Sequence, residues 1–460
     1  MAEETRYLSL NLYVRNSGYH EASWRISSAD PAAALDPRYY VDLARVAERG
    51  VLDSVFLPDS PGMVRFRSAH LPSTGLDPVQ LLSAVAQSTT HIGLVATVST
   101  TYTQPWETAR RLATLDFLSQ GRAGWNIVTT AEPEVARNFG NLPHPPHAQR
   151  YERAQEYVDV VLKLFDGWSD TAAVMSRADG VWADTTQITS PHHHGRHFDV
   201  EGPLPLPRSP QGRPYLTQAG ASPAGMELAA RYADAVFTPQ RDVPSAVAFR
   251  GRLREMTAQF GRSADHFKVL PGLPFLLGST DAEAKALHTE LEDASSDEFR
   301  WRNTAHLAGL DHTTVDPDAP LPDHILDAQP LTSFGGSIYQ LAKQAPAPFR
   351  EVARRVSALP GALDFIGTPE GLADLITDWW RAGASDGFTL MPNLLPDQVD
   401  LFVGHVVPIL QRRGIARREY RGSTLRDHAG LPWSTHPHNQ KPTMQQPRLA
   451  PGRGSAGVER

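Results

Sequence analysis

Short apolar runs of strand length alternate along this chain with longer segments whose apolar residues recur at helical spacing. The runs that predict strands are Tyr7 to Val14, Leu52 to Leu57, His91 to Val98, Gly124 to Val128, Tyr215 to Gln218, Ala235 to Thr238, Phe267 to Leu277 and Gly387 to Met391. The segments that predict helices are Pro37 to Arg49, Pro78 to Thr89, Pro105 to Leu118, Tyr151 to Trp168, Pro223 to Tyr232, Val243 to Phe260, Thr368 to Ala382 and Gln398 to Arg413. Eight such units predict a (β/α)8 TIM barrel, because parallel strands need long crossovers and a closed barrel buries every strand. An open doubly wound sheet is the alternative.

Two stretches interrupt this alternation and are interpreted as insertions. Ser169 to Arg213 follows the fourth helix, and residues 294–365 lie between units seven and eight. Long insertions in barrels sit on loops, often over the active mouth. Residues 1–433 are therefore expected to form one barrel domain. Residues 434–460 lose the periodicity and are rich in Pro, Gly, Gln and His, which predicts a flexible C-terminal tail.

The composition is globular and excludes several classes of function. Hydrophobic residues make up 41% of the 460, and the net charge of -7 comes without a dense basic run, which argues against nucleic acid or an anionic membrane as a main partner. Cys is absent, so disulfides, thiolate metal sites and cysteine nucleophiles are excluded. The chain starts without a signal-peptide pattern and has no membrane-length apolar run, so a cytoplasmic location is expected.

Polar residues at the ends of the predicted strands are the candidates for chemistry, because strand ends form the mouth of a barrel. Asn126 interrupts an apolar strand within GRAGWNIVTT and needs a hydrogen-bond partner if it is buried. The other candidates at strand ends are Asp59, Thr97, Ser99, Thr129, Thr130, Gln218 and Ser222. They form no strong acid–base or metal constellation, and they fit a hydrogen-bonding rim around a flat ligand with polar edges. A core amide bonded to neighbouring backbone is the alternative for Asn126.

The segment QAGASPAG, Gln218 to Gly225, predicts an anion site. Ser222 stands at an N-cap position with Pro223 after it, and free N–H groups at a helix start suit a phosphate. Arg150 and Tyr151 open the helix after the Asn126 strand and could reach a phosphate oxygen. A plain helix cap and a solvated first turn are the structural alternatives.

Histidines suggest two further possibilities. His192, His193, His194 and His197 could bind metal, but consecutive side chains on an extended chain alternate faces, and no Asp or Glu lies inside the cluster. His20 and Trp24 follow the first strand and would lie at the mouth. A histidine there can act as an acid, base or hydrogen-bond donor, whereas most loop histidines are simply exposed.

Several long motifs resemble the bacterial luciferase-like flavin monooxygenases. They are GRAGWNIVTT with ARNFG, RYERAQEYVDVVLKLFDGW, GPLPLPRSPQGRPYLTQAGAS, FIGTPEGLADLI, VVPILQRRG and YRGSTLRDHAGLP. Within that family the chain is most similar to the group of nitrilotriacetate monooxygenase, dibenzothiophene-sulfone monooxygenase and pristinamycin synthase, over roughly residues 7 to 433. The resemblance implies a TIM barrel that uses reduced FMN, delivered by a separate NAD(P)H:flavin reductase, to activate O₂. A homodimer is also implied.

The resemblance also assigns roles to particular residues. Asp59 and Thr97 match contacts near the isoalloxazine, and Asn126 matches its pyrimidine-side partner. Tyr151 and Ser222 match the phosphate-binding positions, with Arg150 as a weaker candidate, and Ala221 is a further candidate for cofactor contact. Three further candidates do not come from the resemblance: His20 is the candidate catalytic residue from its expected place at the mouth, and Trp24 and Phe334 are candidates for substrate contact.

The chain departs from the family pattern at two places. Pro58 precedes Asp59 where the group reads FLAD, and Ser333 to Pro360 is interrupted by Pro where a more regular helical insertion is expected. Both the turn at Asp59 and the region that covers the substrate therefore differ from the pattern.

The resulting hypothesis is a two-component FMNH₂-dependent monooxygenase acting on a small organic substrate. The cofactor carries the flavin chemistry, and the protein binds it, excludes water and positions the substrate, so a catalytic triad is not expected. An F420-dependent oxidoreductase and a non-catalytic flavin-binding protein are the alternatives, and a metal-dependent hydrolase built on the His cluster is a third. The sequence leaves open the substrate and the type of bond oxidised.

Overall fold

A computed structural model of the chain describes residues 6–62, 70, 72, 75–140, 143–328, 335–356 and 363–434. Eight parallel strands form a barrel in the order β1 (Ser9–Tyr13), β2 (Ser54–Leu57), β3 (Gly93–Ser99), β4 (Ala123–Val128), β7 (Tyr215–Ala219), β8 (Ala235–Thr238), β9 (Lys268–Leu277) and β11 (Gly387–Pro392). The barrel closes because β1 pairs with β11, and Leu12 lies opposite Leu390. The predicted TIM barrel is confirmed, and the open doubly wound sheet is wrong because the first and last barrel strands pair.

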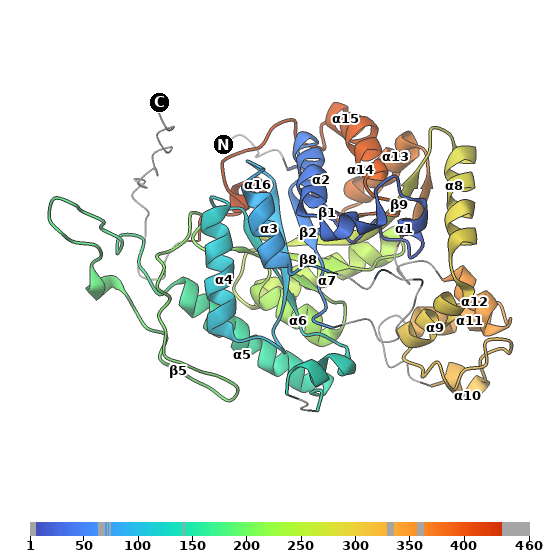
Figure 1. The fold of residues 1–460 in the computed structure, drawn as a ribbon, viewed down its shortest axis with the longest axis horizontal. Helices are drawn as coiled ribbons and strands as arrows, with labels where there is room; N and C mark the ends of the chain where they lie inside the picture. The colour runs from blue at the N-terminus through green and yellow to red at the C-terminus, as the bar shows by residue number, and fades with distance from the viewer. Residues whose placement is uncertain are drawn as a thin grey trace, which may run out of the picture.

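Helices surround the barrel (Figure 1). They are α2 (Pro37–Arg49), α3 (Pro78–Ala86), α4 (Pro105–Leu118), α5 (His147–Phe165), α6 (Pro223–Tyr232), α7 (Val243–Gln259), α8 (Asp281–Ala294), α13 (Pro369–Arg381), α14 (Asp397–Leu401), the π-helical turn η5 (Phe402–Val406) and α15 (Val407–Arg412). Several start where the sequence places a capping side chain before Pro, as at Asp36, Asp77, Ser222, Asp242 and Thr368. Helix α8 was not predicted from the sequence. It starts after Thr280, whose side chain caps the helix by accepting from the N–H of Glu283.

Short elements join these units. They are α1 (Ser23–Ile26), η1 (Pro31–Leu35), η2 (Pro133–Asn138), η3 (Thr185–Gln187), η4 (Ala264–His266) and α16 (Leu425–His428). The largest cluster of buried residues lies between the strands and the helices, with Trp125, Tyr157 and Phe388 fully buried in it. No helix among the described residues is long and apolar enough to cross a membrane.

The segment after α15 closes the N-terminal end of the barrel. Leu425 of α16 packs in one buried cluster with Phe56, Val95 and Tyr215, which come from barrel strands. Arg417 donates to Asp53 at 2.8 Å and Arg426 donates to Asp234 at 2.9 Å, and all four side chains are buried. The same carboxylates accept the backbone N–H groups of Leu10 and Leu216. Each ion pair therefore fixes the closing segment to the start of a strand.

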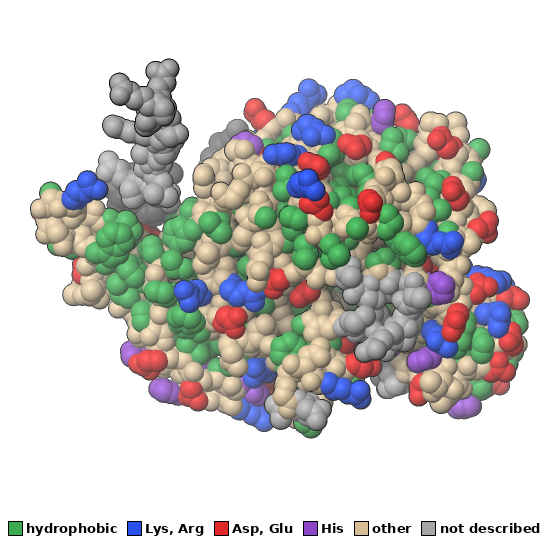
Figure 2. Space-filling view, in the orientation of Figure 1, with side chains coloured by type: hydrophobic (Ala, Val, Ile, Leu, Met, Phe, Trp, Pro, Cys, Tyr) green, Lys and Arg blue, Asp and Glu red, His purple; other side chains and the backbone are tan. Residues whose placement is uncertain are grey.

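The first insertion forms an arm on the outside of the barrel. It extends from the body at the left of Figure 1, and Figure 2 shows hydrophobic side chains along it. Its short strands β5 (His193–His194) and β6 (Asp199–Val200) pair, and His193 bonds to Glu156 of α5 at 3.0 Å. This insertion follows the helix α5 and precedes the strand β7. Such a connection leaves and re-enters the barrel at the N-terminal ends of the strands.

The second insertion is helical and reaches the C-terminal end of the barrel. It contains α9 (Asp297–Leu307), α10 (Asp323–Leu326), α11 (Gly335–Gln344) and α12 (Phe349–Arg355), which share a small core around Ile338 and Phe349. Strand β10 (Phe365–Gly367) then pairs with the last residues of β9. The helices α11 and α12 are separate, and Pro346 and Pro348 lie between them. On the face seen in Figure 2, charges of both signs are mixed over these helices at the lower right.

Candidate functional site

Thr97 and Asn126 form a buried pair on neighbouring barrel strands. They lie opposite each other in the register of β3 and β4, and Asn126 Nδ2 donates to Thr97 Oγ1 at 2.9 Å. Asn126 Oδ1 is buried and has no hydrogen-bond partner among the described residues. An unpaired buried acceptor is costly, so this oxygen is suited to an N–H donor from a ligand. Farther along the same strands, Thr130 donates to Ser99 at 2.7 Å.

The start of α6 forms a small cradle with Tyr151 of α5. Ser222 Oγ caps the helix by accepting from the N–H of Gly225 at 3.1 Å. A Cβ atom placed on Gly225 would lie 3.2 Å from Ser222 Oγ and 3.2 Å from Tyr151 Oη, so the two hydroxyls face a common point. Ala221 lies half-buried in the turn that leads from β7 to the cap. Backbone N–H groups at a helix start and two hydroxyls are the donors that a phosphate requires.

Gly220 and Gln218 complete the turn beneath this cradle. The φ of Gly220 is +159°, and a Cβ there would lie 2.9 Å from Gln218 Nε2 and 3.5 Å from Tyr151 Oη. Gln218 Nε2 donates to the carbonyl of Ala219 at 2.7 Å, and its buried Oε1 has no hydrogen-bond partner within the described structure. The site therefore has acceptors at Asn126 and Gln218 and donors at the helix start, which fits a flavin with an amide-edged ring and a phosphate.

Asp59 lies two residues beyond the end of β2, on the mouth side of the barrel, and its side chain is only partly open to water. Removal from water by the surrounding protein raises the pKa of Asp59 to about 6, and the carboxylate of Asp77 adds to this rise. The N–H of Ser60 and the charge of Arg111 act in the opposite direction. A carboxyl group with this pKa can hold or release a proton near neutral pH.

Arg150 is turned to a different set of partners from its neighbour Tyr151. Its Nη1 donates to His144 Nε2 and to the carbonyl of Pro145, both at 2.8 Å. Burial lowers the pKa of His144, and Arg150 lowers it further, so the ring is neutral. Because Nε2 accepts from Arg150, the proton is on Nδ1 and is donated to Tyr102 Oη at 2.7 Å. Arg150 therefore supports the loop before α5, and its buried Nε has no hydrogen-bond partner among the described residues.

His20 is buried and both of its ring nitrogens are occupied. The backbone N–H of Ala22 donates to Nδ1 at 3.2 Å, which places the proton on Nε2. Nε2 then donates to Glu292 of α8 at 3.0 Å, and Arg300 donates to the same carboxylate at 2.8 Å. The sequence could not reveal this link, because 272 residues separate His20 from Glu292. His20 thus joins the loop after β1 to α8.

Of the two predicted substrate residues, the structure describes only Trp24. Trp24 is half-buried, and its ring N–H donates to the carbonyl of His70 at 3.1 Å. Phe334 lies outside the described residues.

Sequence reasoning missed an aromatic group at the end of β1. Tyr13 is stacked on Phe56 with ring centroids 5.6 Å apart, and Tyr19 meets it edge-on at 5.7 Å. Tyr13 packs against the cluster that contains Val95 and Tyr215, which are interior strand residues. The alternation along β1 could have pointed to Tyr13, since it shares a face of the strand with Asn11, which is a polar residue buried between apolar neighbours.

The histidines of the arm pair with separate carboxylates. His193 bonds to Glu156, His194 to Asp199 at 3.0 Å, and His192 lies 2.6 Å from Glu201. Among the described residues no group of three or more His, Asp or Glu side chains is arranged to hold a metal ion.

Comparison with known proteins agrees with the barrel and the character of this site. The family model of luciferase-like monooxygenases matches residues 20–386. Nitrilotriacetate monooxygenase component A from Aminobacter aminovorans is 41% identical over 438 residues, which cover 93% of this chain and 97% of that protein. The crystal structure of DmoA from Hyphomicrobium sulfonivorans superposes with a TM-score of 0.83 at 31% identity, covering 94% of this chain and 95% of the other.

A structure with a flavin is also similar. Riboflavin lyase, solved with modified FMN and riboflavin, has a TM-score of 0.82 at 30% identity and covers 93% of this chain and 96% of the other. Together with the donors and acceptors at the mouth, this likeness supports a flavin cofactor. The resemblance noted in the sequence is confirmed: the chain belongs to the luciferase-like monooxygenase family and is a flavin-dependent monooxygenase.

Proposed function

We propose that this protein is the oxygenating component of a two-component monooxygenase. It uses FMNH₂ from a separate NAD(P)H:flavin reductase and transfers one atom of O₂ to a small organic substrate. The observation that carries the choice of a phosphorylated flavin is the shared cradle of Tyr151, Ser222 and Gly225. Riboflavin has no group to fill such a cradle, whereas FMN has a phosphate.

The residues of the chain have distinct parts in this proposal. Tyr151, Ser222 and the first N–H groups of α6 hold the phosphate. Asn126 presents its free Oδ1 to a ring N–H and is kept in orientation by Thr97. The bound flavin supplies the oxygen chemistry, and the protein contributes binding, orientation and exclusion of water.

The mouth residues complete the proposal. Asp59 lies beside the ring, where its raised pKa suits the exchange of a proton. We assign His20 a positioning role, because its two bonds fix the β1 loop against Glu292. Trp24 and Phe334 stay candidates for substrate contact, and Arg150 stays a weaker candidate for phosphate contact.

The first test compares the binding of FMNH₂ and reduced riboflavin under anaerobic conditions. Wild-type protein should bind FMNH₂ at least tenfold more tightly, and a Tyr151→Phe, Ser222→Ala double variant should lose that preference, a difference of about 1.4 kcal/mol or more. Ser296→Ala is the matched control, because Ser296 is also a helix cap and bonds to the N–H of Phe299 at 3.3 Å. Equal binding of the two flavins by the wild type would contradict the phosphate site.

Adding O₂ to the anaerobic complex with FMNH₂ distinguishes a monooxygenase from an F420-dependent oxidoreductase and from a flavin-storage protein. Oxygen uptake with an oxygenated product supports the monooxygenase. Tight binding of reduced F420 without oxygen uptake would favour hydride transfer, and flavin binding without product from any substrate would favour flavin storage. A cytoplasmic homodimer that meets the reductase transiently is part of the same proposal, and sedimentation of the purified chain tests the dimer.

A further inference from the structure

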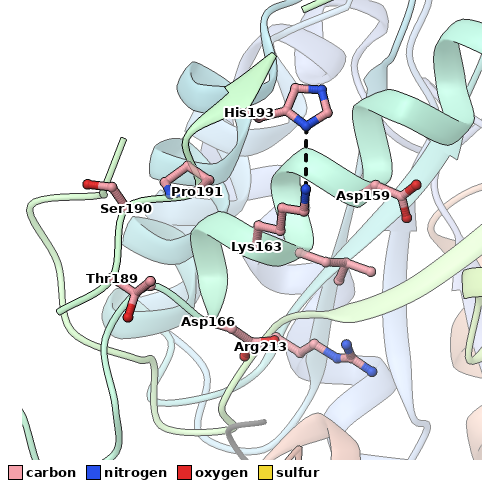
Figure 3. A pocket seen from close by; sticks show the side chains of 10 residues that line it. Asp159, Lys163, Asp166, Thr189, Ser190, Pro191, His193 and Arg213 are labelled. Carbon is pink, nitrogen blue, oxygen red and sulfur yellow. Dashed lines mark hydrogen bonds between the residues drawn. The ribbon is translucent and has the colours of Figure 1, made fainter. Parts of the chain in front are cut away.

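A cavity of about 540 Å³ lies on the outer side of α5, away from the mouth. Its wall is built from the C-terminal half of α5, from residues 189–193 of the arm, and from Arg213, which precedes β7 (Figure 3). Ser222 follows the same strand at its other end. The strand β7 rises about 3.3 Å per residue, so the five residues of Tyr215–Ala219 hold the cavity and the phosphate cradle roughly 16 Å apart or more.

The carboxylates of this cavity already have partners. Asp159 accepts from Tyr232 Oη at 2.7 Å, and Asp166 is paired with Arg208 at 3.1 Å. Asp234, which lies near Arg213, is engaged by Arg426 at 2.9 Å and by the N–H of Leu216.

The two cationic side chains of the cavity, Lys163 and Arg213, have fewer partners than its carboxylates. Lys163 Nζ has only a long contact of 3.5 Å with His193 Nδ1 (Figure 3). Arg213 makes no hydrogen bond or ion pair with any described residue, and its Nε is buried without a partner. Burial lowers the pKa of Arg213; the charges of Arg426 and Arg208 lower it further, and Asp234 and Asp166 oppose them. Carboxylates lie near this guanidinium, but none among the described residues is paired with it, so it is free to bind a supplied anion.

We propose that this cavity is an anion-binding site centred on Arg213, and that it takes a small molecule carrying a phosphate or a carboxylate. The planar fork of Arg binds either group through two parallel N–H donors. Lys163 lies at another side of the cavity, so a ligand with a second acceptor group spans the two cations. Because the arm contributes Thr189, Ser190 and Pro191 to the wall, a bound anion also ties the arm to α5. The site is independent of the flavin.

Calorimetric titration with inorganic phosphate tests this site in a background that lacks the mouth cradle. The Tyr151→Phe, Ser222→Ala variant should bind one phosphate per chain, and adding Arg213→Met should abolish that binding. Sodium chloride at equal ionic strength is the control for screening. A parallel titration with acetate distinguishes a carboxylate ligand from a phosphate ligand by which of the two binds more tightly. Undiminished phosphate binding after Arg213→Met would overturn the proposal.

Thermal unfolding gives a second readout that a purely structural arginine would not produce. In buffer free of phosphate, sulfate and carboxylates, Arg213→Met should be at least as stable as the parent, because an unpaired buried charge is removed. Saturating phosphate should raise the Tm of the parent by at least about 2 °C and leave that of Arg213→Met unchanged. If Arg213→Met does not fold, Arg213→Lys keeps the charge without the fork and should weaken phosphate binding about tenfold. Unchanged binding in Arg213→Lys would count against the assigned role.

Discussion

The hydroxyl oxygens of Tyr151 and Ser222 each lie 3.2 Å from the point that a Cβ atom on Gly225 would occupy. Gly225→Ala should therefore place a methyl group where the phosphate is held. We expect the affinity for FMNH₂ to fall at least tenfold, or about 1.4 kcal/mol. The free energy of unfolding should change by less than about 1 kcal/mol, because Ala is favoured over Gly inside a helix and offsets the tight contact.

Gly251→Ala is the matched control for this prediction. Gly251 lies inside α7, and a Cβ there would meet nothing within 4 Å. This variant should bind flavin as the wild type does. Unchanged FMNH₂ affinity in Gly225→Ala would contradict the phosphate cradle, and anaerobic fluorescence titration measures both variants.

His20→Ala should affect stability more than the chemical step. It removes two buried hydrogen bonds and leaves Glu292 with Arg300 alone, which should cost about 1–3 kcal/mol of unfolding free energy. The KM for substrate should rise, because the loop after β1 loses its contact with α8. Burial tends to raise the pKa of Glu292, but the bond from His20 and the charge of Arg300 lower it, so the carboxylate is ionised.

Urea unfolding and steady-state kinetics of His20→Ala distinguish positioning from catalysis. Glu292→Gln keeps the shape of the partner and should reproduce the rise in KM with a smaller loss of stability. A fall in kcat of a hundredfold or more at unchanged stability would show instead that His20 acts on the reacting atoms.

His428 should make the protein sensitive to acid. Its ring is buried and lies tilted against Tyr420, with ring centroids 4.7 Å apart. Burial lowers its pKa from 6.5 to about 4; Arg417 and His91 add to the decrease, and Asp53 and Asp427 oppose it. Below pH 6.5 the unfolded chain binds a proton that the folded chain does not accept until about pH 4. The free energy of unfolding should therefore decrease as the pH is lowered from 6.5 to about 4, by up to about 3 kcal/mol.

Urea unfolding at pH 7 and pH 5 measures this effect. His428→Phe keeps an aromatic ring against Tyr420 and removes the imidazole that binds the proton. The stability of this variant should therefore change less between the two pH values. His194→Phe is the control, because the side chain of His194 is 74% exposed. Equal pH dependence of His428→Phe and wild type would exclude His428 as the cause.

The barrel could be predicted from the sequence because its elements are encoded locally. Strand runs such as His91 to Val98 and caps such as Ser222 before Pro223 are set by neighbouring residues, and all eight predicted barrel strands form. Helix α8 was missed, although Thr280 and Glu283 form a capping pattern, because charged and small residues dominate the segment and only Ala284 and Leu291 of it are buried.

The candidate site was predictable where it lies at strand ends. Thr97 and Asn126 are polar residues in such positions, and they are hydrogen-bonded to each other. The partner of His20 could not be foreseen, since Glu292 is reached only through the packing of α8 on α1. The bonds of Arg150 to His144 and Pro145 were also hidden, because the fold of the loop before α5 cannot be read from the sequence.

The pairing of β1 with β11 has a consequence for the synthesis of the chain. The first strand, β1, gains its second neighbour only when the last strand, β11, pairs with it. The ion pairs of Arg417 and Arg426, which cover the N-terminal end of the barrel, come later still along the chain. Until residues beyond 426 leave the ribosome, β1 has an unpaired edge and the N-terminal end of the barrel lacks its cover. Contacts between such distant parts of a chain form slowly, so closure of the barrel is a late step in the folding of this enzyme.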